Sequence, residues 1–186
     1  MIYILPTDTC YGIACALDDK ASYEKIYKIK KRNHGKALAI MVESFKWLRE
    51  NTELTDEQVD FLETYEKPFT ILTDSRPVRL FLEFQDENEE YFINKDVYEY
   101  ISFRVASNDI EEKIISKVGP IWLTSANLSG TWETYNIEKI KEDFAYYLEK
   151  ELVKILGKYS LDETTPPSDV FRFIGESVEL EYLRKN

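Results

Sequence analysis

Hydroxyl and carboxylate side chains cluster near the start of the sequence, in Thr7–Asp8–Thr9 between Pro6 and Gly12. They separate two short apolar runs, Ile2–Leu5 and Ile13–Leu17, which are typical of β-strands. Pro6 restricts its own φ and is expected to end the first strand, and Gly12 allows conformations that other residues avoid. Two interpretations are open: a turn whose side chains cap local amides, or a polar loop at a strand end, where open α/β sheets bind ligands.

A second polar group, Ser125–Gly130, directly follows the short apolar run Ile121–Thr124. Small, hydroxyl-bearing residues and a glycine let several backbone amides approach an anion closely, which is typical of a phosphate-binding loop. The same residue types also form ordinary turns, so the pattern alone leaves both interpretations open.

Basic side chains stand out because the chain is acidic, with a net charge of −11. Five of the eight residues in Lys25–Arg32 are basic. They suit the negative end of a helix dipole, but their mutual repulsion would also be relieved by a bound anion. Arg104 lies inside an apolar strand between Phe103 and Val105. It therefore either faces solvent or is held inside by an anion.

Composition limits the class of protein. A chain of 186 residues with 44% hydrophobic and 32% charged residues is expected to form one globular domain, and no repeat or linker divides it. Its two cysteines and single histidine argue against a zinc site, and we expect both thiols to be reduced and structural. The acidic balance argues against broad nucleic-acid binding. No apolar run reaches the length of a membrane helix and no signal-peptide pattern is present, so a cytoplasmic location without membrane contact is expected.

Periodicity and capping residues predict an alternation of strands and helices. Helices are predicted from Asp18–Asp19 to about Arg32, from Thr55 with a Gln58 capping box, from Asn108 to Val118, and from Ile137 to about Glu149. Strands are predicted at Ile2–Leu5, Ile13–Leu17, Ala37–Val42, Phe69–Thr73, Ile101–Val105, Ile121–Thr124 and Leu152–Leu156, with a closing hairpin of Asp169–Ile174 and Val178–Leu183 that turns at Gly175. Asp86–Glu90 and Lys158–Ser168 are predicted to be loops.

The order and spacing of these motifs resemble the YrdC-like family of threonylcarbamoyl-adenylate synthases over nearly the whole chain. The family's Pro-Thr-(Asp/Glu)-Thr-x-Tyr-Gly loop corresponds to Pro6–Gly12, and its Ser-Ala-Asn-x-Ser-Gly loop to Ser125–Gly130. Its Lys-x-Arg corresponds to Lys30–Arg32, a Lys-Pro-Leu-like strand start loosely to Lys36–Leu38, and its Val-Arg strand to Phe103–Val105.

The resemblance implies an α/β fold: a single domain over residues 1–186, with a twisted mixed sheet flanked by helices around a deep basic cavity. The implied reaction condenses L-threonine, bicarbonate and ATP into L-threonylcarbamoyladenylate and releases pyrophosphate. The ATP would bring Mg²⁺, with no dedicated metal site on the protein. The product would serve threonylcarbamoyladenosine modification of tRNA by a separate transfer complex, which is a possible partner.

Site residues follow from the resemblance position by position. Lys30 and Arg32 are implied to be catalytic and to hold the triphosphate. Contacts to the substrate threonine are implied for Thr9, Arg104, Ser125 and Ser168, and further contacts to the nucleotide for Lys36, Asn127, Tyr135 and Arg184.

The chain also departs from the family pattern. It begins only a few residues before Pro6, where the family usually has a helix and a glycine turn. Asn33 replaces a proline, Met41 a histidine, Glu66–Thr70 a Trp-Pro-Gly-Pro-Leu-Thr segment, and Asp169 a threonine. These changes concern the threonine side more than the phosphate side. The alternatives are a nucleotide-binding paralogue without synthase activity, an RNA-binding module, or a carbamoyl-transfer unit of a larger machine.

Overall fold

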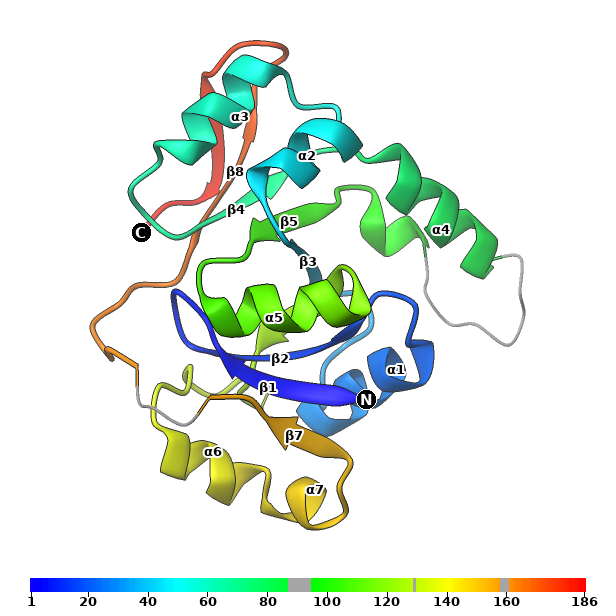
Figure 1. The fold of residues 1–186 in the computed structure, drawn as a ribbon, viewed down its shortest axis with the longest axis vertical. Helices are drawn as coiled ribbons and strands as arrows, with labels where there is room; N and C mark the ends of the chain where they lie inside the picture. Colours follow the sequence, from blue (N-terminus) through cyan, green and yellow to red (C-terminus); the bar gives the residue numbers. More distant parts are fainter. Residues whose placement is uncertain (87–94, 129, 158–160) are drawn as a thin grey trace.

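The computed structural model describes residues 1–86, 95–128, 130–157 and 161–186, which form a nine-stranded mixed sheet with helices on both faces (Figure 1). In chain order the elements are β1 (Ile2–Pro6), β2 (Tyr11–Ala16), α1 (Lys20–Lys30), β3 (Ala39–Val42), α2 (Phe45–Asn51), α3 (Asp56–Glu63), β4 (Phe69–Leu72), α4 (Arg76–Asp86), the 3₁₀ helix η1 (Lys95–Tyr98), β5 (Ser102–Val105), α5 (Asp109–Val118), β6 (Ile121–Ser125), α6 (Ile137–Asp143), α7 (Ala145–Glu149), β7 (Val153–Ile155), β8 (Asp169–Phe173) and β9 (Leu180–Arg184).

The strand order β7-β1-β2-β6-β3-β5-β4-β8-β9 places strands from both ends of the chain in one sheet. Three neighbouring pairs are parallel, namely β1 with β7, β3 with β5 and β4 with β8, and the other five are antiparallel. The expectation of a twisted mixed sheet flanked by helices is confirmed.

Two apolar clusters pack the helices on the sheet. On one face, Ile114 and Ile115 of α5 contact Leu5, Met41 and Leu123 from the strands, and α5 crosses the front of the sheet in Figure 1. The larger cluster contains buried aromatic side chains such as Trp122, Tyr98 and Phe171 together with apolar residues of α1. Burial of these side chains supplies most of the driving force for folding.

The first two strands differ slightly from their predicted bounds. Pro6 remains within β1, where it pairs with Tyr11. This is tolerated because β7 accompanies β1 only as far as Ile4, which leaves Pro6 with a strand on one side only. Gly12 is closely packed, because a Cβ there would lie 2.6 Å from Leu123 Cδ1 and would force that side chain to shift.

Several helical predictions need correction. Helix α1 ends at Lys30 and not at Arg32, because Lys31 adopts a left-handed conformation with φ 50°. The helix predicted over Ile137–Glu149 divides at Phe144 into α6 and α7. Helices α2 and α4 were not predicted. The strand predicted from Ala37 begins at Ala39, and the segment expected as a loop at 86–90 lies outside the described residues from position 87 onward.

The predicted capping box and closing hairpin are confirmed, and one side chain joins them. Thr55 and Gln58 cap α3 reciprocally. The buried Gln58 also donates from Nε2 to the carbonyls of Gly175, at 2.9 Å, and Ser177, at 2.8 Å, in the β8–β9 turn. The outer hairpin is therefore tied to α3 by a single amide.

Within the described part of the chain, none of the helices combines the length and apolar character that crossing a bilayer requires.

Replacing Gln58 by Met tests this tie between helix and hairpin. The variant loses two hydrogen bonds and half of the capping box, so we expect the free energy of unfolding to fall by about 1–2 kcal/mol. Urea unfolding measures the change. Glu57→Gln, one residue earlier on the exposed side of α3, is the control and should remain within about 0.5 kcal/mol of the parent protein. Equal stability of both variants would contradict the role of Gln58.

Candidate active site

A cavity of about 460 Å³ opens among the β1–β2 turn, the strands β2 to β6 and the β8–β9 hairpin. Its size lies in the range of small-molecule sites. The predicted site residues on its wall are Thr9, Arg32, Arg104, Ser125, Tyr135, Ser168 and Arg184. These residues are far apart in sequence, and the sheet topology brings them to one hollow.

The polar residues between β1 and β2 both cap a local turn and line the cavity, so both interpretations of this segment hold. Thr7 Oγ1 donates to the carbonyl of Cys10 at 2.7 Å and accepts from the amide of Thr9 at 3.2 Å, so Thr7 caps the turn. Thr9 then lies on the cavity wall, with its hydroxyl 3.0 Å from that of Thr7. Cys10 is also on the wall. Burial raises the pKa of its thiol to about 11, so it stays protonated and is no nucleophile.

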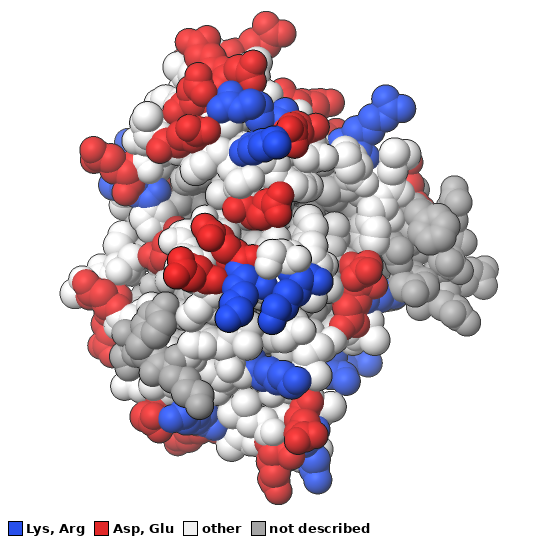
Figure 2. All heavy atoms as spheres, in the orientation of Figure 1, with Lys and Arg blue, Asp and Glu red and all other residues white. Residues whose placement is uncertain are grey.

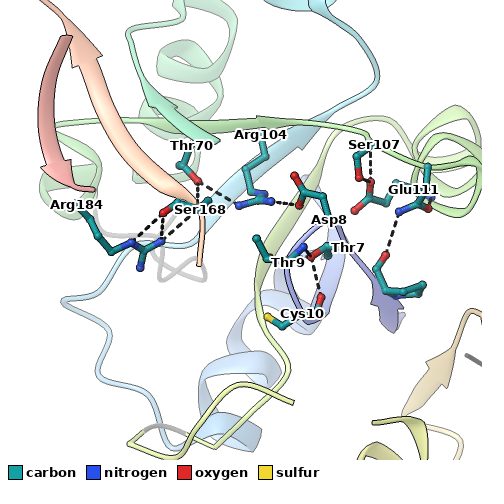
Figure 3. A network of polar contacts seen from close by, with 12 residues as sticks. Thr7, Asp8, Thr9, Cys10, Thr70, Arg104, Ser107, Glu111, Ser168 and Arg184 are labelled. Atoms are coloured by element: carbon teal, nitrogen blue, oxygen red, sulfur yellow. Dashed lines mark hydrogen bonds and ion pairs between the residues drawn. The ribbon is translucent and has the colours of Figure 1, made fainter. Parts of the chain in front are cut away.

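Arg104 is held in β5 by a row of polar side chains that crosses the sheet (Figure 3). Its Nη2 pairs with Asp8 Oδ1, and its Nη1 lies 3.4 Å from Thr70 Oγ1. Its buried Nε has no hydrogen-bond partner in the structure. Arg104 therefore faces inward, and it keeps unused capacity to donate hydrogen bonds to an anion.

The row continues to the C-terminal hairpin. Thr70 Oγ1 lies 3.0 Å from Ser168 Oγ, and Arg184 of β9 donates from Nη2 to the carbonyl of Ser168 at 2.7 Å and to its hydroxyl at 3.1 Å. Figure 3 shows Arg184, Ser168, Thr70 and Arg104 in sequence. The hairpin at the edge of the sheet thus contributes directly to the cavity wall.

A buried carboxyl group lies beside this row. Glu111 of α5 is fully buried, and its Oε2 accepts from the amide of Ser107 at 2.6 Å and from its hydroxyl at 2.8 Å. Burial raises the pKa of Glu111 to about 7. Asn108 caps α5 and also donates from Nδ2 to the carbonyl of Pro6, which fastens the start of α5 to the end of β1.

Arg32 lies in the segment that follows α1 and lines the cavity, and two main-chain carbonyls hold its guanidinium. Its Nε donates to the carbonyl of Lys36 at 3.1 Å and its Nη2 to that of Ala37 at 2.9 Å. The Lys36 side chain is exposed and does not line the cavity, so the structure supports only its carbonyl as a contributor. The prediction of a nucleotide contact by the Lys36 side chain gains no support.

Three buried tyrosines set the backbone that holds Arg32. Tyr27 donates to the carbonyl of Lys36 at 2.8 Å, and Tyr98 accepts from the amide of Leu38 at 3.2 Å. The hydroxyl of Tyr23 joins the two, at 3.1 Å from Tyr27 and 2.7 Å from Tyr98. The three tyrosines therefore fix the backbone at Lys36 and Leu38, next to the carbonyls that accept hydrogen bonds from Arg32.

Lys30, predicted to be catalytic and to hold the triphosphate, lies behind the cavity wall in this structure. It is 1% exposed and does not line the cavity. Its Nζ donates to the carbonyls of Ser125 and Asn127 and, at 3.3 Å, to Asn127 Oδ1. An ammonium has three donors, and all three are used by this loop. Lys30 thus fastens the loop after β6 and has no donor left for a phosphate in this arrangement.

The rest of that loop is closed by its own side chains. Ser125 Oγ donates to Asn127 Oδ1 at 2.5 Å, and Asn127 Nδ2 donates to the carbonyl of Thr131 at 2.5 Å. Ser125 lines the cavity, but Asn127 is buried behind it and does not. Tyr135 lines the cavity, and its hydroxyl lies 3.3 Å from the carbonyl of Thr165.

The wall residues that sequence reasoning missed include Thr70 and Glu133. Thr70 sits in a strand whose alternation could not tell which face the cavity would occupy. Glu133 follows the Ser125–Gly130 motif without a recognisable pattern of its own. In the described ranges, no three side chains of His, Cys, Asp or Glu gather closely enough to hold a metal ion.

Fold and site together define a class of protein: a mixed α/β sheet around a cavity lined by hydroxyl and guanidinium groups. The family model of Sua5, YciO and YrdC proteins, described as "Telomere recombination", matches residues 1–184, and the chain belongs to this family.

Curated relatives are named threonylcarbamoyl-AMP synthase. The protein of Homo sapiens is 26% identical over 151 residues, which is 76% of this chain and 47% of that protein, so this chain spans about half the length of the human relative. The protein of Vibrio vulnificus (strain YJ016) is 24% identical over 160 residues, covering 82% of this chain and 79% of the relative.

Solved structures share the fold. P. abyssi Sua5, crystallised with L-threonine, superposes with a TM-score of 0.73 at 21% identity and covers 98% of this chain and 49% of its own. E. coli YciO superposes with a TM-score of 0.69 at 20% identity and covers 99% of this chain and 84% of its own. At these identities the likeness establishes the fold.

The buried ammonium of Lys30 predicts a pH effect on stability. Burial, followed by the charge of Arg32, lowers the pKa of Lys30 to about 8, below the value near 10.4 of an unfolded chain. Between these pH values the unfolded chain holds a proton that the native protein has released. Stability should therefore rise with pH through this interval, by up to about 1.4 kcal/mol per pH unit.

Comparison with Lys30→Met isolates this contribution. Urea unfolding of both proteins between pH 7.5 and 10 should give a difference in unfolding free energy that grows with pH. Lys117→Met, which removes an exposed lysine of α5, should run parallel to the parent protein. A difference for Lys30→Met that is constant across this range would contradict the assignment.

Proposed function

We propose that the protein condenses L-threonine, bicarbonate and ATP into L-threonylcarbamoyladenylate and releases pyrophosphate. One observation carries the proposal: Arg32, Arg104 and Arg184 converge on one cavity whose wall also presents the hydroxyls of Thr9, Ser125 and Ser168. Three guanidinium groups suit ligands with several anionic groups, because guanidinium binds carboxylate and phosphate through paired hydrogen bonds. The names of the curated relatives and the threonine in the P. abyssi Sua5 crystals support the same substrates.

In this proposal each side of the cavity binds one substrate. Arg104, which lines the cavity, binds the threonine carboxylate, and Thr9, Ser125 and Ser168 offer hydroxyls to the same molecule. Arg32 binds the phosphates, and Tyr135 and Arg184 contact the nucleotide. Lys30 and Asn127 act behind the wall by fixing the loop that carries Ser125.

The chemistry needs no protein nucleophile. The amino group of threonine combines with bicarbonate to give a carbamate and water, and a carbamate oxygen then attacks the α-phosphate of ATP as pyrophosphate leaves. The protein contributes by holding two anions in contact and by neutralising the charge that develops on the phosphates. A magnesium ion accompanies the ATP, whose phosphates supply ligands to it. The product would pass to a separate complex that modifies tRNA.

A nucleotide-binding paralogue without synthase activity is the second candidate, and two side chains favour it. Met41, at a position where the resemblance implies a histidine near threonine, is fully buried in the apolar cluster that α5 forms with the sheet. Asp169, where a threonine is implied, is buried and bonded to Tyr65 at 2.6 Å and to the amide of Asn186 at 2.7 Å. Neither lines the cavity.

The RNA-binding alternative gains no comparable support. On the face shown in Figure 2, Lys and Arg side chains lie among Asp and Glu and form no continuous basic surface. Binding to nucleic acid depends on many phosphate contacts made by such a surface.

Pyrophosphate release separates the first two candidates. With ATP, bicarbonate and Mg²⁺ present, release should require L-threonine and should stop when threonine is omitted. Release that does not depend on threonine, or binding of ATP with no release, would instead favour the paralogue.

Two arginine variants test the division of the cavity. Arg32→Ala should weaken ATP binding by about 1.5–3 kcal/mol, the cost of a charged hydrogen bond, with little effect on threonine. Arg104→Ala should weaken threonine binding by a similar amount and spare ATP. Calorimetric titration measures both ligands, and Lys117→Ala, an exposed charge on α5, is the control for the change in net charge. Equal losses for both ligands in both variants would contradict the division.

A further inference from the structure

One carboxylate on the cavity wall is unexplained by the function proposed above. Among the described residues that line the cavity, Glu133 is the single acidic side chain, and it faces a wall with three arginines. It is half-buried and forms no hydrogen bond or ion pair in the structure. Glu133 shares this cavity with three arginines and pairs with none of them, so its carboxylate is available to a ligand.

Backbone hydrogen bonds fix the segment that carries Glu133. The amide of Tyr11 donates to the carbonyl of Thr134 at 2.9 Å, and the carbonyl of Tyr11 accepts from the amide of Ala126 at 2.6 Å. Two residues after Glu133, the carbonyl of Tyr135 accepts a hydrogen bond from the amide of Leu161 at 2.8 Å. The segment is thus fastened beside the turn that presents Thr9 to the cavity.

Charges of both signs act on this part of the wall. The negative charge of Glu133 raises the pKa of the Cys10 thiol, and the positive charge of Arg104 lowers it. Cys10 follows Thr9 directly in the turn. The space beside this turn therefore lies within reach of one anion and one cation, which is the pair of charges needed to bind a zwitterion.

We propose that Glu133 binds the ammonium group of the amino-acid substrate while Arg104 binds its carboxylate; this inference rests on the proposed function. Three arginines alone would favour any small anion and would bind a hydroxy acid as well as an amino acid. A carboxylate in the same cavity adds attraction for the ammonium, whose nitrogen can react with bicarbonate once it has given a proton to water or to that carboxylate. Glu133 is thereby a specificity-determining residue for α-amino acids.

A magnesium ion is the competing ligand for this carboxylate. Among the described residues Glu133 belongs to no group of three His, Cys, Asp or Glu side chains that could hold a metal ion together, and a half-buried carboxylate without such a group is a weak site for Mg²⁺. An ammonium needs only one charged acceptor if neutral acceptors complete its hydrogen bonds. The hydroxyls of Thr9 and Ser125 on the wall can serve as these neutral acceptors.

Binding measurements on the full chain test the inference without relying on turnover. L-Threonine and 3-hydroxybutyrate, which has the same carboxylate and hydroxyl but no amino group, are titrated separately into the parent protein and Glu133→Gln. The parent should prefer threonine. The variant should lose at least tenfold in threonine affinity and keep its affinity for 3-hydroxybutyrate and ATP.

Two further variants complete the design. Glu133→Asp keeps the charge and should recover part of the preference for threonine, which a purely structural role would not predict. Glu163→Gln is the matched control, because Glu163 shares with Glu133 the neighbouring hollow of Leu128–Asn136 but does not line the cavity. It should leave both affinities unchanged.

Each contrary result has a distinct meaning. If the parent binds threonine and Glu133→Gln binds it equally well, or loses both small ligands alike, this inference is overturned and the proposed function stands. If Glu133→Gln weakens ATP only when Mg²⁺ is present, the carboxylate serves the metal and the inference is again overturned. If the parent binds ATP but no threonine, the proposed function fails and this inference with it.

Discussion

Burying a cation costs several kcal/mol unless oxygen atoms surround it, and this fold buries two of them, Lys30 and Arg104, around one hollow. Each solves the problem differently. Lys30 spends all three of its donors on the loop after β6, so its charge is satisfied by the protein itself. Arg104 is satisfied only in part, by Asp8 and a long contact to Thr70. The first cation therefore holds the architecture, and the second remains open to a ligand.

This contrast explains why elements distant in sequence meet at the cavity. Lys30 joins the end of α1 to the loop after β6, and the row from Arg104 through Thr70 and Ser168 to Arg184 joins the centre of the sheet to its outer hairpin. The tyrosine chain adds a third connection on the side of Arg32. Polar contacts between the elements thus join them around the cavity, whereas the apolar clusters pack the helices against the sheet.

Much of the fold could be predicted because local signals agreed with tertiary structure. Alternating apolar runs marked the strands, and the caps at Thr55 and Asn108 are present as predicted. The missed helix α2 has only seven residues and depends on Ser44, whose cap the apolar pattern did not reveal. Lys31 was placed inside α1 because nothing in its side chain signals a left-handed conformation.

The site was predicted less evenly, for a physical reason. A sequence motif identifies which side chains lie near one another, but how deeply each side chain is buried decides whether it contacts the cavity or only other protein atoms. Lys30 and Asn127 are one layer behind the wall, while Arg32 and Ser125 form it. Thr70 and Glu133 reach the wall only because β4 pairs with β5 and because the main chain after Gly130 returns to Tyr11. Such placement follows from pairing across long sequence distances, which no local pattern records.

The pairing of Asp8 with Arg104 has a consequence for how the cavity fills. Because Asp8 pairs with Arg104, the charge of the guanidinium is already neutralised within the protein, and an anion that binds there exchanges with this carboxylate. Asp8 is 28% exposed and can turn to water when it is displaced, whereas Arg104 cannot leave. For a carboxylate that binds Arg104, the net affinity would be the difference between two ion pairs.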